Sequence, residues 1–337
     1  MRSVVLVLAL LVPAVARAQS MVTVNLSPEG QQLAQQLGYS AADLAAEIRS
    51  RIDDAYAIAN VDDFLKAFAD ATSFSARGLG VDYASIPRGV IAGVAANVAA
   101  AGEDNVRSEE LPTAGLAANI AVLLGMNLAE WNHPRWTVFA NGFYRTASAE
   151  RLDGTITSIG AHLQYTVIPP APNDVTGAIL RWTGVNVTGG LEYTRWSLGS
   201  GNEELRTDFG VANGGAVVVL DSVGRFDLSA NAVTVPVEVA TGMRVAMIAT
   251  VYVGAGLDFT VGGSDIDASL AGTMTTTDGR NVGTASILAS GDEGATPVTA
   301  RVLAGVQLNL WKLKLFAQLN ASQTPAASVG FGLKFVQ

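Results

Sequence analysis

Apolar and polar residues alternate with a period of two along most of the chain after residue 72. In the C-terminal segment, Val329, Phe331 and Leu333 alternate with glycine or polar residues. Such alternation is typical of a β-strand with one apolar face and one polar face. The clearest segments lie near residues 88–100, 115–126, 135–147, 154–168, 178–198, 237–249, 250–262, 265–277, 297–311, 312–322 and 326–336. The pattern therefore predicts an all-β fold for residues 72–337.

Two classes of fold produce this alternation, because the apolar face of a strand is buried either in a protein core or in lipid. The predicted strands are about 10 to 15 residues long, whereas strands of soluble proteins average about 5 to 6. Short turns such as Gly262-Gly263 and Trp311-Lys312 alternate with long polar segments such as Ser200–Asp208, an asymmetry that outer-membrane barrels show. We therefore predict a transmembrane antiparallel up-and-down β-barrel of about 14 strands, within a range of 12–16.

Aromatic residues lie mostly near the ends of the predicted strands, where membrane barrels carry aromatic girdles at the two interfaces. The residues assigned to these girdles are Trp136, Tyr144, Trp182, Tyr193, Trp196, Trp311 and Phe335. Their placement favours the barrel, although the same residue types also fill the cores of β-sandwiches.

Residues 19–71 have helical rather than strand periodicity. Ser27 precedes Pro28, which predicts a helix N-cap followed by proline at the first helical position. Ser40 and Asp43 form a capping box with Asp in place of the usual Glu. Amphipathic helices need a surface to pack against, so we expect this short N-terminal α-helical segment to plug the barrel or to cap it in the periplasm.

The first 18 residues have the pattern of a secretory signal peptide. Arg2 supplies the positive charge, Val4–Val12 is an uninterrupted apolar run, and Ala16-Arg17-Ala18 is a cleavage site of the A-x-A kind. The apolar run is too short for a membrane-spanning helix. The sequence thus predicts export of the chain from the cytoplasm.

Together, the signal peptide and the closing strand Val329–Phe335 resemble those of Gram-negative outer-membrane β-barrel proteins, over about residues 72–337. In that class the last strand alternates apolar residues and ends in an aromatic residue, which the barrel-assembly machinery recognises. Here Val336 and Gln337 follow Phe335. The resemblance implies location in the outer membrane, contact with outer-membrane lipid and insertion by that machinery.

If the apolar face of each strand points to lipid, the polar face lines the lumen. The charged residues that this parity assigns to the lumen are Arg145, Glu192, Arg244, Asp258, Arg301, Lys312, Lys314 and Lys334. We therefore predict a porin-like channel for passive transport of small polar solutes, whose bore is limited by the N-terminal helices and by the lumen charges. Two alternatives are a non-conducting structural or adhesion barrel that works through its loops, and a secreted soluble β-sandwich that binds a ligand.

The composition argues against several other functions. The chain has no cysteine, only two histidines and a formal charge of −9, so we expect neither a zinc or cofactor site nor nucleic-acid binding. Parity directs His162 into the lumen and His133 lies in a predicted turn, which gives no catalytic pair; we expect no enzyme activity. The acidic pair Asp265 and Asp267 lacks the spacing of a calcium loop.

Overall fold

The computed structural model describes residues 19–56, 61–85, 89–102, 114–149, 152–171, 179–210 and 217–336. The predicted signal peptide, residues 1–18, lies outside them. Twelve antiparallel strands form one sheet in the described part of the chain. They are β1 (Gln19–Leu26), β2 (Val90–Gly102), β3 (Ala114–Leu128), β4 (His133–Ala149), β5 (Leu152–Ile168), β6 (Leu180–Gly210), β7 (Val217–Val245), β8 (Ala249–Thr276), β9 (Asn281–Gly294), β10 (Val298–Leu310), β11 (Leu313–Ser322) and β12 (Ala326–Val336).

Ten of these strands close into a ring, because β8 pairs with β7 on one edge and with β10 on the other. The ring runs through β2 to β8 and then β10 to β12, and β12 pairs with β2. One edge of β8 pairs with β10 over residues 249–259 and, further along, with β9 over residues 263–275. Strand β1 then pairs with the far side of β9. The sheet is therefore a closed barrel from which a second, open sheet continues.

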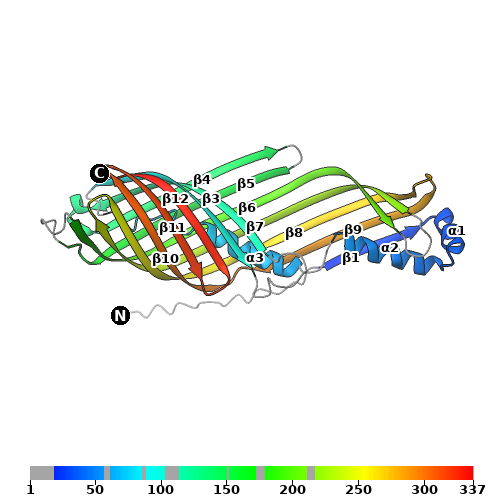
Figure 1. The fold of residues 1–337 in the computed structure, drawn as a ribbon, viewed down its shortest axis with the longest axis horizontal. Helices are drawn as coiled ribbons and strands as arrows, with labels where there is room; N and C mark the ends of the chain where they lie inside the picture. The colour runs from blue at the N-terminus through cyan, green and yellow to red at the C-terminus, as the bar shows by residue number, and fades with distance from the viewer. Residues whose placement is uncertain are drawn as a thin grey trace, which may run out of the picture.

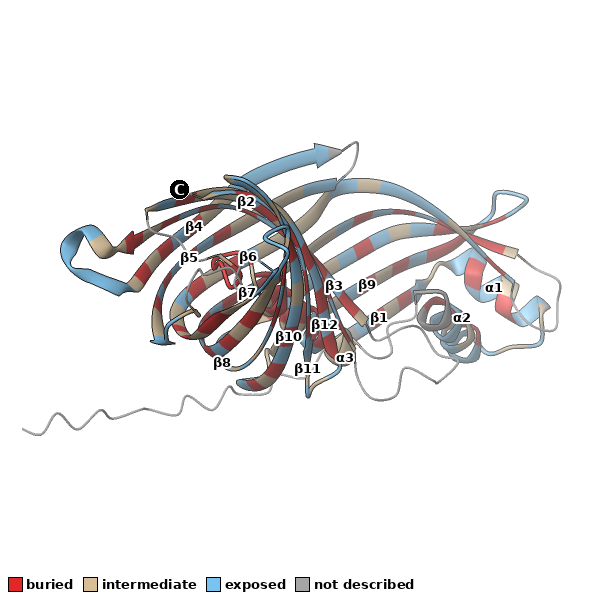
Figure 2. Cartoon of the chain, turned by 60° about the vertical axis from the view of Figure 1, so that its left-hand side comes forward, coloured by how far each residue is buried: buried red, intermediate tan, exposed pale blue. Residues whose placement is uncertain are grey.

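The outer surface of the ring is apolar. Val98, Leu319 and Phe331 are more than half exposed there, and buried positions alternate with exposed ones along each strand (Figure 2). Strands β10, β11 and β12 have 13, 10 and 11 residues, lengths that match those of membrane-crossing strands, about 9 to 11 residues. The fold is thus a transmembrane β-barrel, as the alternation predicted. None of the helices in the described ranges is long and apolar enough to cross a bilayer.

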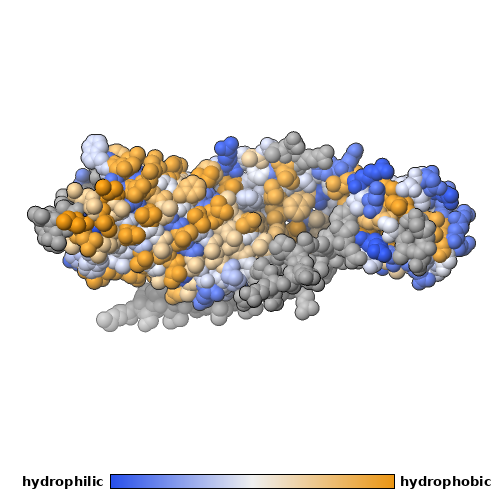
Figure 3. Space-filling model, in the orientation of Figure 1, coloured by the Kyte–Doolittle hydropathy of each residue, from blue (hydrophilic) through white to orange (hydrophobic). Residues whose placement is uncertain are grey.

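Strands β6, β7 and β8 are much longer, with 31, 29 and 28 residues. Beyond the ring they form, with β9 and β1, a curved sheet that we call the extension (Figure 1). Its outer face carries charges, among them the ion pair between Arg225 and Asp227 and the Arg206 and Asp221 pair. Hydrophilic residues accordingly gather at this end of the molecule, whereas apolar residues cover the barrel (Figure 3).

The described residues form twelve strands, which lies within the predicted range of 12–16 and below its central value of fourteen. One cause of the difference is the Gly262-Gly263 pair, which was predicted to be a turn and lies inside β8. Gly262 has φ 147°, and a Cβ there would lie 2.1 Å from the Asn231 carbonyl oxygen. The glycine therefore serves close packing and twist within one long strand.

The helices are α1 (Pro28–Gln36), α2 (Ala41–Tyr56) and α3 (Val61–Ser75), with a short 3₁₀ helix η1 (Ala129–Trp131) between β3 and β4. Ser27 caps α1 as predicted, its hydroxyl accepting from the Gly30 N–H at 3.0 Å. The Ser40 and Asp43 capping box of α2 also forms, with 3.1 Å between the Asp43 amide and the Ser40 hydroxyl. Strand β1, which precedes these helices, was not predicted.

The N-terminal helices have two different locations. Helices α1 and α2 pack on the inner face of the extension, where Leu44, Ile48 and Ile52 are buried with residues of β1 and β7 to β9. Helix α3 contacts β2, β3, β7 and β8 and thus enters the ring (Figure 1). We call residues 61–85, which comprise α3 and the buried segment after it, the plug.

Gly115 allows α3 to lie against β3. A Cβ at this position would lie 2.3 Å from the Ala67 carbonyl carbon and the Phe68 amide nitrogen. We expect Gly115→Ala to displace α3 and to lower the free energy of unfolding by about 1 to 3 kcal/mol, measured by denaturant titration in micelles. Gly142→Ala is the matched control, because its nearest neighbour would be 3.8 Å away. Equal stability of the two variants would contradict the close helix–strand contact.

Candidate functional site in the barrel lumen

Hydrogen bonds from the barrel wall hold the plug in the lumen. The Ser264 hydroxyl donates to the Leu65 carbonyl at 2.6 Å, and the Thr296 amide and hydroxyl donate to the Asp70 carboxylate at 2.6 and 2.8 Å. Further in, the Asn97 side-chain amide donates to the carbonyls of Ser75 and Arg77 at 3.0 Å each. These contacts come from β8, β2 and the segment before β10, so the plug is anchored on several sides of the ring.

Residues 76–85 continue the plug without regular secondary structure, and almost all of them are buried. Asp82 shapes this segment, because its carboxylate accepts from the Ala84 and Ser85 amides at 3.1 Å each. Gly80 permits close passage along the wall, since a Cβ there would lie 2.2 Å from His162 Nε2. The lumen is therefore filled by main chain and side chains along this stretch.

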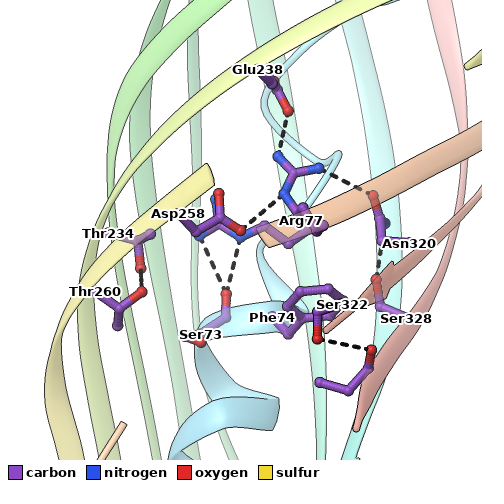
Figure 4. A network of polar contacts seen from close by, with 12 residues as sticks. Ser73, Phe74, Arg77, Thr234, Glu238, Asp258, Thr260, Asn320, Ser322 and Ser328 are labelled. Carbon is purple, nitrogen blue, oxygen red and sulfur yellow. Dashed lines mark hydrogen bonds and ion pairs between the residues drawn. The ribbon is translucent and has the colours of Figure 1, made fainter. Parts of the chain in front are cut away.

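Arg77 is the plug's main charged contact with the wall. Its guanidinium lies 2.5 Å from the Glu192 carboxylate of β6 and 3.5 Å from the Asp258 carboxylate of β8. It also donates to the Ser73 carbonyl one turn earlier in α3 (Figure 4). Glu192 further lies 3.4 Å from His162 Nε2. Arg77 thus bridges two acidic residues on different strands while it stays buried.

Arg301 of β10 forms the part of this network that joins strands of the barrel wall to one another. It pairs with Glu238 of β7, and its Nε donates to Asp258 at 2.9 Å. The second oxygen of Glu238 accepts from the Tyr83 hydroxyl of the plug at 2.6 Å, and the Tyr83 ring stacks on Tyr252 with centroids 5.8 Å apart. Glu238, Asp258 and Ser73 come together around the lumen in Figure 4.

A second ion pair lies nearer the C-terminal end of the barrel. Lys334 of β12 lies 3.3 Å from Asp82 of the plug, and its ammonium is 4.0 Å from the centre of the Phe316 ring. Gln307 donates to the Ser85 hydroxyl at 3.1 Å. The plug is therefore held by polar contacts along its whole path through the ring.

The charges in this network are unevenly divided between plug and wall. Three cations, Arg77, Arg301 and Lys334, face four carboxylates. The plug contributes one charge of each sign, Arg77 and Asp82, so the wall contributes three carboxylates and two cations to this network, apart from Arg244 and Lys314 nearer the C-terminal end. Near Arg77 the imbalance is greater, because Glu192, Glu238 and Asp258 would share only Arg301. A lumen without the plug would be acidic at this level.

Comparison with known proteins gives a family. Residues 16–337 match the family described as Lsa36-like. The chain belongs to the Lsa36-like family. Among solved structures, the chain is similar to the translocator domain of autotransporter NalP from Neisseria meningitidis, with 13% identity, a TM-score of 0.35 and coverage of 81% of this chain and 99% of that one. It is also similar to the attachment invasion locus protein Ail of Yersinia pestis, with 12% identity, a TM-score of 0.25 and coverage of 73% and 95%. A third is the Ralstonia pickettii toluene transporter TbuX, with 8% identity, a TM-score of 0.25 and coverage of 81% and 99%. No curated protein sequence matches the chain.

In this Lsa36-like chain, the eight predicted lumen residues lie in different places. Glu192, Asp258, Arg301 and Lys334 are buried in the lumen, in contact with the plug or with one another. Arg244 and Lys314 are partly buried on the inward-facing positions of β7 and β11, near the C-terminal end.

The other two lie outside the lumen. Arg145 is exposed on β4, on a part of the strand that no longer pairs with β3. Lys312 lies at the outer rim, with its ammonium 5.5 Å from the Trp311 ring and 5.8 Å from the Phe335 ring. Parity fails for Lys312 because it lies in the turn between β10 and β11.

Six of the seven predicted girdle residues lie on the outward-facing side of their strands or turns. Trp136, Trp182, Trp311 and Phe335 lie near the end of the barrel that holds the C terminus, whereas Tyr144 and Tyr193 lie further toward the extension. Trp196 was assigned wrongly, because it points inward. It packs edge-to-face on Phe68 of the plug, with centroids 6.0 Å apart, and its indole donates to the Ala118 carbonyl at 2.9 Å.

Several residues of the site were missed from the sequence. Arg77, Asp82 and Tyr83 lie in a segment without periodicity, so no pattern indicated that it enters the lumen. Glu238 could have been found, since it alternates with Val237 and Val239 on β7. Within the described ranges, no group of three or more histidine or acidic side chains is arranged to hold a metal ion.

Proposed function

We propose that the protein is an outer-membrane barrel that is closed by its own N-terminal segment and presents the extension outside the membrane as its working part. The observation that carries this proposal is the plug, whose residues 76–85 are buried across the lumen. Filling of the bore by these described residues argues against passive diffusion in the plugged state. The polar outer face of the extension fits an aqueous location beyond the lipid.

The direction of the chain supports the cell surface as the location of the extension. The turns Ala246–Ile248 and Trp311-Lys312 at the C-terminal end of the ring are short, and barrels have short periplasmic turns and longer extracellular segments. Ile91 of β2 pairs with Val336 of β12, so the plug must cross the whole lumen between the extension and the start of β2. The N-terminal helices and the C terminus then lie on opposite sides of the membrane.

Cysteine labelling tests this orientation directly, because the chain has no cysteine of its own. We expect a membrane-impermeant maleimide to label Thr277→Cys, in the turn at the tip of the extension, on intact Gram-negative cells. Ile248→Cys, in the turn between β7 and β8 at the other end, should react only after permeabilisation. The reverse pattern would place the extension in the periplasm and contradict surface presentation.

Conductance tests the closed state. The refolded mature protein should show no steady current in a planar bilayer, while its heat-dependent shift on SDS gels verifies the fold. Steady current from the full chain would contradict the closed barrel and favour the porin-like channel for small polar solutes.

A second candidate function, a channel gated by movement of the plug, is favoured by the chemistry of the contacts between plug and wall. Beside apolar clusters, these contacts include ion pairs and hydrogen bonds, which water can replace when the plug leaves. The acidic residues around Arg77 would make the opened lumen selective for cations.

The proposal includes outer-membrane lipid and the barrel-assembly machinery as partners, and neither nucleic acid nor an enzymatic substrate. The buried imidazole of His162 supports this last point, because it lies against Glu192 and close to Gly80 and Gly190 inside the lumen. It is therefore remote from the lipid face, where a lipid-hydrolysing group would have to lie.

A further inference from the structure

The barrel wall between β3 and β4 is closed over only part of its length. The pairing of these two strands ends at Val122 and Gly142. Beyond that point β3 stays paired with β2 and β4 stays paired with β5, but β3 and β4 diverge from each other (Figure 1). No strand in the described part of the chain pairs with the two edges that are left. We call residues 114–121 of β3 and 143–149 of β4 the open seam.

Contacts inside the barrel draw the free edge of β3 toward the lumen. The Trp196 indole of β6 donates to the Ala118 carbonyl of β3 at 2.9 Å, although β4 and β5 stand between these two strands in the sheet. The Asn119 side-chain amide of β3 likewise donates to the Ser158 hydroxyl of β5 at 3.1 Å. The free edge of β3 is therefore displaced inward from the position that continued pairing with β4 would require.

Helix α3 of the plug stabilises this inward position. It lies directly against Gly115, where a Cβ would be 2.3 Å from the main chain of Ala67 and Phe68. The buried Phe68 ring also packs edge-to-face on Trp196, with centroids 6.0 Å apart. One helix thus contacts both the free edge of β3 and the side chain that holds that edge away from β4.

The free edge of β4 lies in water. Tyr144, Arg145 and Thr146 are all exposed, so both faces of the strand are open here, and unpaired main-chain groups of a strand cannot face hydrocarbon. Water therefore binds the main-chain groups of this edge while α3 is in place. Because β3 and β4 are already aligned at Val122 and Gly142, additional pairs next to them require little further loss of chain entropy.

We infer that withdrawal of α3 lets β3 and β4 pair along the open seam, so that the wall closes as the lumen opens. Continuation of the observed register places Ile120 opposite Tyr144 and Leu116 opposite Ser148. New main-chain hydrogen bonds and the contact between Ile120 and Tyr144 then offset part of the interactions that the plug loses on leaving. The inference gives a mechanism to the movable plug, and its role in the cell rests on that proposed function.

Disulfide crosslinking tests the inference, because the chain has no cysteine of its own. The upper pair is Ile120→Cys with Tyr144→Cys, and the matched lower pair is Leu124→Cys with Ala140→Cys, which lie opposite each other in the closed part of the ladder. Opposite residues have Cα atoms about 4.5 to 5.5 Å apart, within reach of a disulfide. With copper phenanthroline as oxidant, only the lower pair should crosslink in the full mature chain. In the chain that lacks residues 19–85, both pairs should crosslink to the same extent.

A variant of the full chain gives a second measurement that does not depend on folding of the shortened chain. Trp196→Phe keeps an aromatic ring beside Phe68 but removes the donor to the Ala118 carbonyl, so crosslinking of the upper pair should increase. Trp182→Phe is the matched control, because it removes an indole donor to the Thr241 hydroxyl, remote from the open seam. It should leave the upper pair without a crosslink.

Three results would contradict the inference. Crosslinking of the upper pair in the unsubstituted full chain would overturn the open seam. A shortened chain in which the lower pair crosslinks and the upper pair does not would overturn closure of the wall on plug release. Equal crosslinking in the Trp196→Phe and Trp182→Phe variants would overturn the role of Trp196. Surface labelling and conductance are measured separately, so failure here is distinguishable from failure of the proposed function.

Discussion

Replacing Arg77 by alanine is expected to lower the free energy of unfolding by about 3 to 5 kcal/mol, because it leaves the buried Glu192 carboxylate without its cation and removes one of the two cations beside Asp258. Arg77 is 2% exposed and lies between Glu192 and Asp258. Buried charges without a compensating partner carry a large desolvation penalty. Denaturant titration of the refolded protein measures the change, and hydrogen exchange of residues 76–85 should increase because the plug loses its central contact.

Arg51→Ala is the matched control for this variant. Arg51 also forms an ion pair, with Glu47 at 3.0 Å, but on an exposed face of α2. Exposed pairs contribute little, about 0.2 to 1 kcal/mol, so its loss should have a small effect. If Arg77→Ala and Arg51→Ala destabilise the protein equally, the plug is not held by its charges.

Removal of residues 19–85 is expected to convert a silent barrel into a cation-selective channel. Without Arg77, Asp82 and Tyr83, the wall residues Glu192, Glu238 and Asp258 face water with Arg301 as their neighbouring cation. An acidic ring at the constriction attracts cations and repels anions. The reversal potential across a salt gradient in a planar bilayer measures the selectivity, and the shift on SDS gels verifies that the shortened chain folds.

Two further chains separate the causes of this result. Deletion of residues 27–56 removes α1 and α2 but leaves the plug, so that chain should remain silent. In the 19–85 deletion, the combined changes Glu192→Gln, Glu238→Gln and Asp258→Asn should abolish the preference for cations. Current from the shorter deletion would assign closure to α1 and α2, and anion selectivity of the longer one would contradict the acidic lumen.

Sequence periodicity predicted the barrel well because a membrane-crossing strand needs apolar residues on its lipid face and places polar residues on its lumen face. Phe331 and Val329 are exposed on the outside of β12, and Ser328 and Lys334 are buried inside, as the alternation indicated. In the extension, the same alternation has a different cause. Its strands β7 and β8 keep the same alternation beyond the ring because α1 and α2 bury their inner face. Periodicity alone could not show where these strands leave the membrane.

The wall residues of the site were predicted from the same alternation, whereas the plug residues were not. Glu192, Asp258, Arg301 and Lys334 occur at polar positions of regular strands, so their inward direction follows from parity. Arg77 and Asp82 occupy an irregular segment whose path depends on long-range contacts with β2, β6 and β12. Trp196 was misassigned because its place near the end of the predicted strand was given more weight than its parity, which it shares with Glu192 and which directs it inward onto Phe68 of α3.

The pairing of β2 with β12 also constrains the order of assembly. These are the first and last strands of the ring, and Ile91 and Val336 lie opposite each other where it closes. Residues 19–85 are synthesised before either strand, yet they end up threaded through the finished ring. Once β12 has paired with β2, a folded α1–α2 unit could not pass back through a lumen that the plug already fills. The plug must therefore lie in the lumen before β12 pairs with β2, which makes this pairing the committing step of biogenesis.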